Sequence, residues 1–255
     1  MAKKKTWKDR LAALVPRYIP NRLVAGVMGL LQMMRKTSKA KVEENCIQNR
    51  SILEEQANVA ERKVFFRPSA FIENQRKWGK VCFGRGYTMA YAGCEIIAVY
   101  NALLSLGREL SAGELAELIS RFERKGAVWG GMWGVTPQSL KPYFKKLGYP
   151  VKKTWSRKEK PINRLGEESD TLIVTSFNNE DDVFDGIHTV NISKDGEGKF
   201  HVHNDYQYYR DAKGSHIYVS RGPYDTLYEA VSKLSGGTAA PLCVMGVKKA
   251  SEEAV

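Results

Sequence analysis

Cysteine and histidine are scarce in this chain, with four of each among 255 residues. The cysteines share no short paired spacing; they are Cys46, Cys82, Cys94 and Cys243. Their distribution excludes a disulfide framework and a zinc ribbon, and it favours a reducing compartment. We therefore expect a cytoplasmic protein.

A long hydrophobic run is also missing. The apolar stretch LVAGVMGLLQMM near the N-terminus is shorter than the roughly 20 residues that a spanning helix needs. The lysines before it resemble the positively charged region of a signal peptide. However, Arg17, Pro20 and Arg22 interrupt the pattern, and no clear small-residue cleavage site follows. We expect neither a spanning helix nor a cleaved signal here.

Acidic residues are almost absent from the first 41 positions, where eleven Lys or Arg stand against Asp9 alone. This segment holds most of the formal net charge of +12, so the body is nearly neutral and a nucleic-acid partner is not expected. An amphipathic cationic helix is typical of proteins that lie on the inner, anionic face of a membrane. The alternative is a solvated arm whose apolar side packs on its own domain or on a partner.

The division of the chain follows from these patterns. We interpret residues 1–64 as a basic amphipathic tail and a surface helix, and residues 65–255 as one domain. Internal repeats, a nucleotide loop and a cofactor motif are absent, so no cofactor is expected. His201 and His203 form a His-x-His pair, but no acidic or cysteine ligand is assigned to the same strand face, so no metal is expected.

Helical patterns fill the first half of the domain and strand patterns the second. Capping residues and terminal glycines predict helices over residues 94–106, 111–126 and 136–148, with Ser111 and Glu114 as a capping box and Thr136 as an N-cap. Short β-rich runs predict strands at residues 171–177, 187–193, 199–205, 216–220 and 241–247, with a last helix at 225–234. The expected fold is α+β in two lobes: a helical lobe, then an antiparallel sheet.

Cys94 opens the most apolar of these helices, in the run YAGCEIIAVYNALLSLG. At the first turn it would face unpaired backbone N–H groups and the positive end of the helix dipole, which lowers the pKa of a thiol. Gly93 would allow a substrate backbone to approach. Cys94 is therefore the candidate nucleophile, although a cysteine at a helix start is commonly a core residue.

His188 is the candidate base because it begins a strand directly after an acidic loop. A hairpin would bring the end of the next strand, Asn204 and Asp205, back beside it to orient its ring. Strand alternation favours Asn204 if Phe200 and Val202 pack inward.

Taken together, these segments carry a resemblance. AGCEIIAVYNALLSLG, GGMWGVTPQSLKPYFKKLGY, IHTVNIS and FHVHNDY resemble the papain-like cysteine peptidases, and more closely the bacterial branch that includes bacteriocin leader peptidases acting after double glycine. The resemblance covers about residues 80–248. It implies a papain-like fold in which a central helix presents Cys94 as nucleophile, with His188 as base and later acid and with Asn204 or Asp205 as orienter.

The sequence departs from this family at one point. The family usually places an oxyanion-binding glutamine about six residues before the cysteine, and Thr88 stands there instead. The hydroxyl of Thr88 or Tyr87 is the expected substitute, beside the backbone N–H of Cys94. Trp129, Trp133 and Tyr100 are candidates to line a substrate groove, although aromatic residues at such positions are more often part of the core.

The expected function is that of a thiol hydrolase acting on a peptide or protein substrate. An acyl or peptidyl transferase would use identical residues. Two non-catalytic alternatives are a papain-like peptide-binding module, which the missing glutamine favours, and a membrane-surface scaffold that depends on the basic tail.

Overall fold

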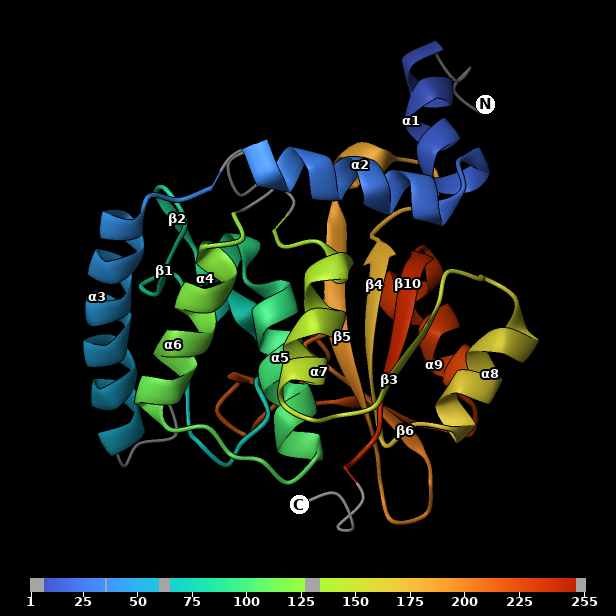
Figure 1. Cartoon of the computed structure of the whole chain (residues 1–255). Coiled ribbons are helices and arrows are strands. Elements are labelled where there is room, and N and C mark those ends of the chain that lie inside the picture. The colour runs from blue at the N-terminus through green and yellow to red at the C-terminus, as the bar shows by residue number, and fades with distance from the viewer. Residues whose placement is uncertain (1–6, 35, 60–64, 127–133, 251–255) are drawn as a thin grey trace.

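A six-stranded antiparallel sheet forms the centre of the protein, in the strand order β3-β10-β4-β5-β6-β9. The computed structural model describes residues 7–34, 36–59, 65–126 and 134–250. Within them the architecture is α+β, with α5 on one face of the sheet and α8 and α9 on the other (Figure 1).

The described elements follow the chain in a simple order. The helices are α1 (Trp7–Tyr18), α2 (Asn21–Met34), α3 (Lys39–Asn58), α4 (Met89–Ala92), α5 (Cys94–Ser105), α6 (Ala112–Glu123), α7 (Leu140–Lys146), α8 (Glu159–Glu167) and α9 (Leu227–Ser232). Short 3-10 turns are η1 (Gln75–Lys77), η3 (Pro137–Ser139), η4 (Val183–Asp185) and η5 (Leu234–Gly237). The sheet strands are β3 (Val151–Thr154), β4 (Thr171–Phe177), β5 (Ile187–Lys194), β6 (Phe200–His203), β9 (Arg221–Tyr224) and β10 (Ala240–Val247). Two small ribbons pair β1 (Cys82–Phe83) with β2 (Tyr87–Thr88), and β7 (Tyr208–Arg210) with β8 (His216–Tyr218).

Both faces of the sheet are covered, which explains the continuous apolar run of β4. Every residue of β4 is buried. Ile173 joins the core on the α5 side, whereas Leu172 and Val174 pack with α8 and α9. A strand covered on both faces has no solvent side to show as polar alternation.

Helix α5 lies in the middle of the larger core, and ten of its twelve residues are buried. It packs on β5 and β4. Its one interior amide, Asn101, donates from its side chain to the carbonyl of Ile72 at 3.0 Å and accepts from the Ile72 N–H at 2.9 Å. This pairing removes the desolvation cost of an amide in an apolar helix.

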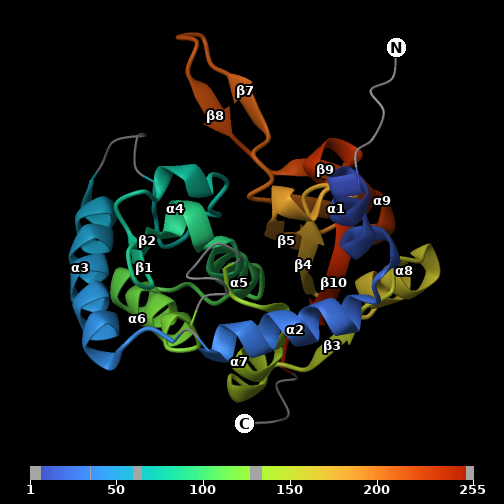
Figure 2. The same ribbon diagram turned by 90° about the horizontal axis from the view of Figure 1, so that it is seen from above.

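The N-terminal helices pack on the rest of the chain. Val24 and Met28 of α2 form a third core cluster with Phe177 and Leu242 at one end of the sheet, and α3 lies along α6 (Figures 1 and 2). Arg17 of α1 forms ion pairs with Glu180 and Asp181. The inner side of the basic segment is therefore covered by its own domain.

The capping residues predicted at two helix starts differ in the contacts that their side chains make. The capping box of Ser111 and Glu114 is confirmed at α6. Thr136 takes the predicted N-cap position, at the start of η3, although its side chain makes no capping hydrogen bond there. Its hydroxyl donates instead to Gln32 Oε1 at 2.6 Å, and Gln32 Nε2 donates to the Gly126 carbonyl, so α2 holds both ends of the segment between α6 and η3.

One expected strand lies outside the main sheet. Residues 216–218 form β8, which pairs only with β7 in a hairpin that projects from the body (Figure 2). The sheet is completed by β3 and β9, which the sequence patterns do not predict. No helix in the described part of the chain is long and apolar enough to cross a membrane.

We expect Gly246→Ala to destabilise the protein. A Cβ at Gly246, on β10, would meet Ser169 Oγ at 1.9 Å, Ser169 Cβ at 2.9 Å and Leu165 Cδ1 at 3.1 Å, so Ser169, just after α8, must move. Overpacking of this kind costs about 1–3 kcal/mol, which urea unfolding measures. The matched control is Gly196→Ala, where a Cβ has nothing within 4 Å and should change the unfolding free energy little. Equal effects of the two substitutions would contradict the close packing of α8 on β10.

Candidate active site

Cys94 is the first residue of α5 and lies where that helix meets β5. Only 5% of its surface is exposed. A Cβ at Gly93 would meet the carbonyl oxygen and the sulfur of Met89, each at 2.6 Å. Glycine is therefore needed here so that α4 can pack tightly before α5.

The thiol of Cys94 donates to Glu95 Oε2 at 3.0 Å. Burial, the charge of Glu95 and this hydrogen bond raise the pKa of Cys94 well above its usual range. Hydrogen bonding from Thr189 lowers that pKa but is outweighed. The expectation of a lowered pKa is therefore wrong, because desolvation and an adjacent carboxylate exceed the effect of the helix N-terminus.

Glu95 is a residue of the candidate site that sequence reasoning missed. Its side chain is completely buried, and burial raises its pKa to about 7. Oε1 has no hydrogen-bond partner among the described residues, and a Cβ at Gly134 would come within 2.7 Å of Oε2. An acid in the first turn of an otherwise apolar helix is the signal that could have identified it.

His188 lies at the start of β5, one residue before Thr189. Its Nε2 is 2.7 Å from the main-chain oxygen of Asn204. A carbonyl oxygen only accepts, so Nε2 carries the proton and Nδ1 keeps its lone pair. Burial, together with the charge of Arg76, lowers the pKa of His188, which makes it a neutral base at pH 7. The imidazole also stacks on Tyr206, with ring centroids 5.3 Å apart.

Asn204 contacts His188 as expected, but through its main chain. Its side chain accepts from the Gln75 N–H at 2.9 Å, and its Nδ2 lies 3.4 Å from Gln75 Oε1. Its φ of 64° lies in the left-handed region, which asparagine tolerates better than most residues. The amide side chain thus fixes the turn that aims the carbonyl at His188.

Asp205 is not directed at His188. Its Oδ2 lies 2.8 Å from Arg221 Nε. Neither Asp205 Oδ2 nor Arg221 Nε makes a hydrogen bond of good geometry among the described residues. The contact is therefore an ion pair in which the Arg221 Nε–H does not point at the carboxylate oxygen. The buried carboxyl group therefore pairs with β9.

The structure brings only part of the expected constellation into contact. No hydrogen bond joins Cys94 to His188 within the described residues; Thr189, which follows His188, is the residue of β5 that bonds to the thiol. The inward-facing side of β6 is as expected, because Phe200 and Val202 are both buried.

The residues proposed for the oxyanion hole form β2, directly before α4. Thr88 precedes this helix without capping it by its side chain, and Tyr87 stacks on Tyr91. Among the described residues, no hydrogen bond involves either hydroxyl. Gln75 is the nearby buried amide, and its Nε2 donates to the Ala90 carbonyl at 3.1 Å.

Tyr100, a candidate to line a substrate groove, belongs instead to the core, which is the more common place for such an aromatic residue. Its ring is buried in the core, and its hydroxyl donates to main-chain oxygens at Arg67 and Pro68. Trp129 and Trp133 lie outside the described residues.

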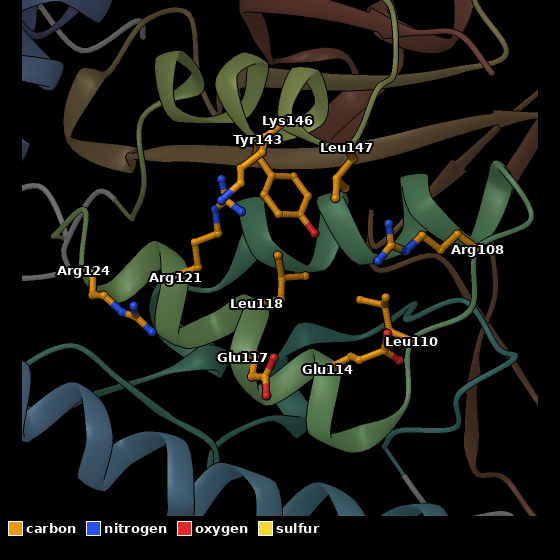
Figure 3. A pocket seen from close by; sticks show the side chains of 10 residues that line it. All are labelled: Arg108, Leu110, Glu114, Glu117, Leu118, Arg121, Arg124, Tyr143, Lys146 and Leu147. Carbon is orange, nitrogen blue, oxygen red and sulfur yellow. The ribbon is translucent and has the colours of Figure 1, made fainter. Parts of the chain in front are cut away.

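Other polar features lie away from Cys94. Among the described residues, no group of three or more His, Cys, Asp or Glu side chains is placed to hold a metal ion. A surface pocket of about 670 Å³ lies between α6 and α7 and is lined by Tyr143 and by the basic residues Arg108, Arg121, Arg124 and Lys146 (Figure 3). Neither Cys94 nor His188 lines this pocket, so it is distinct from the candidate active site.

Comparison of the chain with protein-family models, curated proteins and solved structures gives no match. The chemistry must therefore be argued from the site itself.

We expect Cys94 to react with iodoacetamide as a thiol of raised pKa. Its alkylation rate should keep rising with pH beyond the range where an ordinary cysteine levels off. Glu95→Gln removes the charge and should lower the pKa, which increases the rate at pH 8 by about tenfold. Mass spectrometry of the Cys94 peptide measures both.

The matched control is Glu123→Gln. Glu123 is also fully buried with a pKa raised to about 7, but its carboxylate accepts from Asn45 and Gly84 on the other side of α6. This variant should leave the Cys94 profile unchanged. A wild-type profile that levels off at or below the ordinary range would contradict the assigned role of Glu95.

Proposed function

We propose that the protein is a cysteine-dependent hydrolase of peptide or amide bonds with a papain-like arrangement of its two lobes. The observation that carries the proposal is the placement of a cysteine at the start of the central helix, against the strand of a histidine whose Nδ1 is left free as a base. The helix and the strand come from opposite halves of the chain, as two lobes that share a site require.

The reaction proceeds by acyl transfer to sulfur. His188 Nδ1 takes the thiol proton as Cys94 Sγ forms a bond to the substrate carbonyl carbon, and the imidazolium then protonates the leaving amine. Water hydrolyses the thioester and restores the thiol. The Cys94 N–H, with the hydroxyl of Thr88 or Tyr87, stabilises the oxyanion.

Glu95 determines the protonation state of Cys94 in the resting site. The hydrogen bond to its carboxylate keeps the proton on Cys94, so the enzyme stores a thiol and not a thiolate. Activation then requires that the substrate bring Cys94 and His188 into proton-transfer distance. The same feature supports the alternative of a peptide-binding module, in which the thiol stays inert.

A peptide library incubated with the protein and read by mass spectrometry tests the proposal. We expect cleavage products that Cys94→Ala abolishes, and a loss of about 10²-fold or more in kcat/KM with His188→Ala. His216→Ala is the matched control, because His216 is an exposed histidine on the β7–β8 hairpin.

Each alternative gives a different result in this experiment. Cleavage that survives Cys94→Ala contradicts the mechanism. Reversible peptide binding without cleavage identifies a binding module. Peptide products joined to an added amine, in place of the free acid, identify a transferase that uses the same acyl-enzyme.

We further propose that the protein attaches peripherally to an anionic membrane through α2. Leu23, Val27, Leu30 and Met34 are each between 52% and 79% exposed and recur at helical spacing along its outer side. The opposite side of α2 packs on the domain, so this apolar stripe has no partner within the described structure. The excess of basic residues in positions 1–41 favours anionic lipid as the occupant over a second copy of this equally basic chain.

Co-sedimentation with vesicles containing anionic lipid measures this attachment. Leu30→Glu places a charge in the stripe and should reduce the pelleted fraction toward that seen with neutral vesicles. Ile47→Glu is the matched control: Ile47 is 74% exposed but lies on α3. Equal pelleting of both variants would exclude lipid contact through α2, and dimerisation lost in Leu30→Glu would assign the stripe to a second copy.

A further inference from the structure

A second cluster of reactive side chains lies farther along β5. Ser193 is near the end of this strand, His203 ends the neighbouring strand β6, and Glu73 comes from the segment before η1. None of the three takes part in the chemistry proposed for Cys94.

The three side chains form a continuous hydrogen-bonded chain. His203 Nδ1 lies 2.6 Å from Glu73 Oε1, and His203 Nε2 lies 2.8 Å from Ser193 Oγ. Because the carboxylate accepts, Nδ1 carries the proton, and Nε2 of the neutral ring can only accept from the serine hydroxyl. This is the order of contacts that prepares a serine for nucleophilic attack.

Neighbouring residues fix the positions of the His203 ring and the Glu73 carboxylate. Phe71 stacks on His203 with ring centroids 3.8 Å apart and an interplanar angle of 11°. The second oxygen of Glu73 accepts from the Asn204 N–H at 3.0 Å. His203 is 4% exposed and Ser193 8%, so neither ring nor hydroxyl is free to turn into bulk water.

An open pocket of about 500 Å³ gives access to the cluster, and both Ser193 and His203 line it. Phe71 and Leu104 supply apolar wall. Three further ionisable side chains line the pocket. His201 and Asp195 are paired with each other at 2.8 Å, and the Lys194 ammonium lies over the Phe200 ring, 5.5 Å from its centroid. The pocket therefore suits a small, uncharged acyl group more than an ion.

We propose that Ser193, His203 and Glu73 form a second catalytic site, a serine esterase centre for small uncharged acyl esters. Ser193 Oγ forms a bond to the ester carbonyl carbon while its proton passes to His203 Nε2. His203 then gives this proton to the departing alcohol oxygen. Water, deprotonated by His203, hydrolyses the acyl-serine and releases the acid.

A fluorophosphonate probe tests the site directly, because it captures an activated serine: Oγ bonds to phosphorus and fluoride leaves. The full chain is labelled as wild type and as Cys94→Ala, and the adduct is located by peptide mass spectrometry. We expect the label on Ser193 in both proteins. The result in Cys94→Ala is independent of the hydrolase proposed above, so failure of one proposal does not imply failure of the other.

Variants then assign the roles. Ser193→Ala should abolish the adduct, and Glu73→Gln should slow labelling by at least about tenfold because it removes the charge that stabilises the protonated His203. Ser220→Ala is the matched control, since Ser220 lines the same pocket without such a chain of contacts. Labelling should also disappear on unfolding in urea.

Three results would overturn the proposal: no adduct on Ser193 in the folded wild type, equal labelling before and after unfolding, or an unchanged rate in Glu73→Gln. Hydrolysis of p-nitrophenyl acetate by Cys94→Ala supplies a second readout. It should fall to the background rate in Cys94→Ala carrying Ser193→Ala.

Discussion

The burial of α5 against β4 and β5 is the constraint on which the rest of the structure depends. Because the helix is apolar on nearly all sides, it must be enclosed by both the sheet and the other helices, and its core cluster includes Ile173 and Met245 of the sheet as well as Phe122 of α6. Enclosure removes Cys94 and Glu95 from water together. The same packing that positions Cys94 therefore also determines its protonation state, through desolvation that the helix dipole does not offset.

The turn after β6 shows how a second constraint reaches the site. Asn204 adopts a left-handed backbone conformation while its side chain binds Gln75 and its N–H binds Glu73. These contacts come from a segment about 130 residues earlier in the chain, and they direct one carbonyl at His188. The tautomer of the base thus depends on main-chain geometry, and substitutions at Asn204 would act on His188 indirectly.

The sequence predicts those features that depend on local pattern. The helix at Cys94, the capping box of α6 and the strands β4, β5 and β10 follow from periodicity and capping residues, and all are present. The edge strands β3 and β9 do not follow, because they are only four residues long and gain their identity from pairing with β10 and β6.

The site is predictable to a similar degree. Strand order and hairpin geometry place Asn204 beside His188, but which of its atoms makes the contact depends on the distant Gln75. The raised pKa of Cys94 could not be inferred, since it requires knowing that Glu95 turns inward under Gly134 and not outward to solvent.

A row of polar side chains on β5 connects these observations. Thr189, Asn191 and Ser193 alternate with Val190 and Ile192, which are buried against α8 and α9. Burying such a row is costly unless each member is satisfied, and each is: Thr189 by Thr175 at 3.1 Å, Asn191 by Thr171 at 2.8 Å, and Ser193 by His203.

This row makes the register of β5 specific. A slip of one residue would turn every side chain of β5 to the opposite face of the sheet. Val190 and Ile192 would then lie beside the hydrogen-bonding groups that now satisfy the polar row, and the polar row would face an apolar core. Because the row begins beside Cys94 and ends at Ser193, the constraint that fixes the first site also fixes the second. The two clusters therefore share one rigid strand, and their geometry should be lost together when the packing of α5 on β5 is loosened.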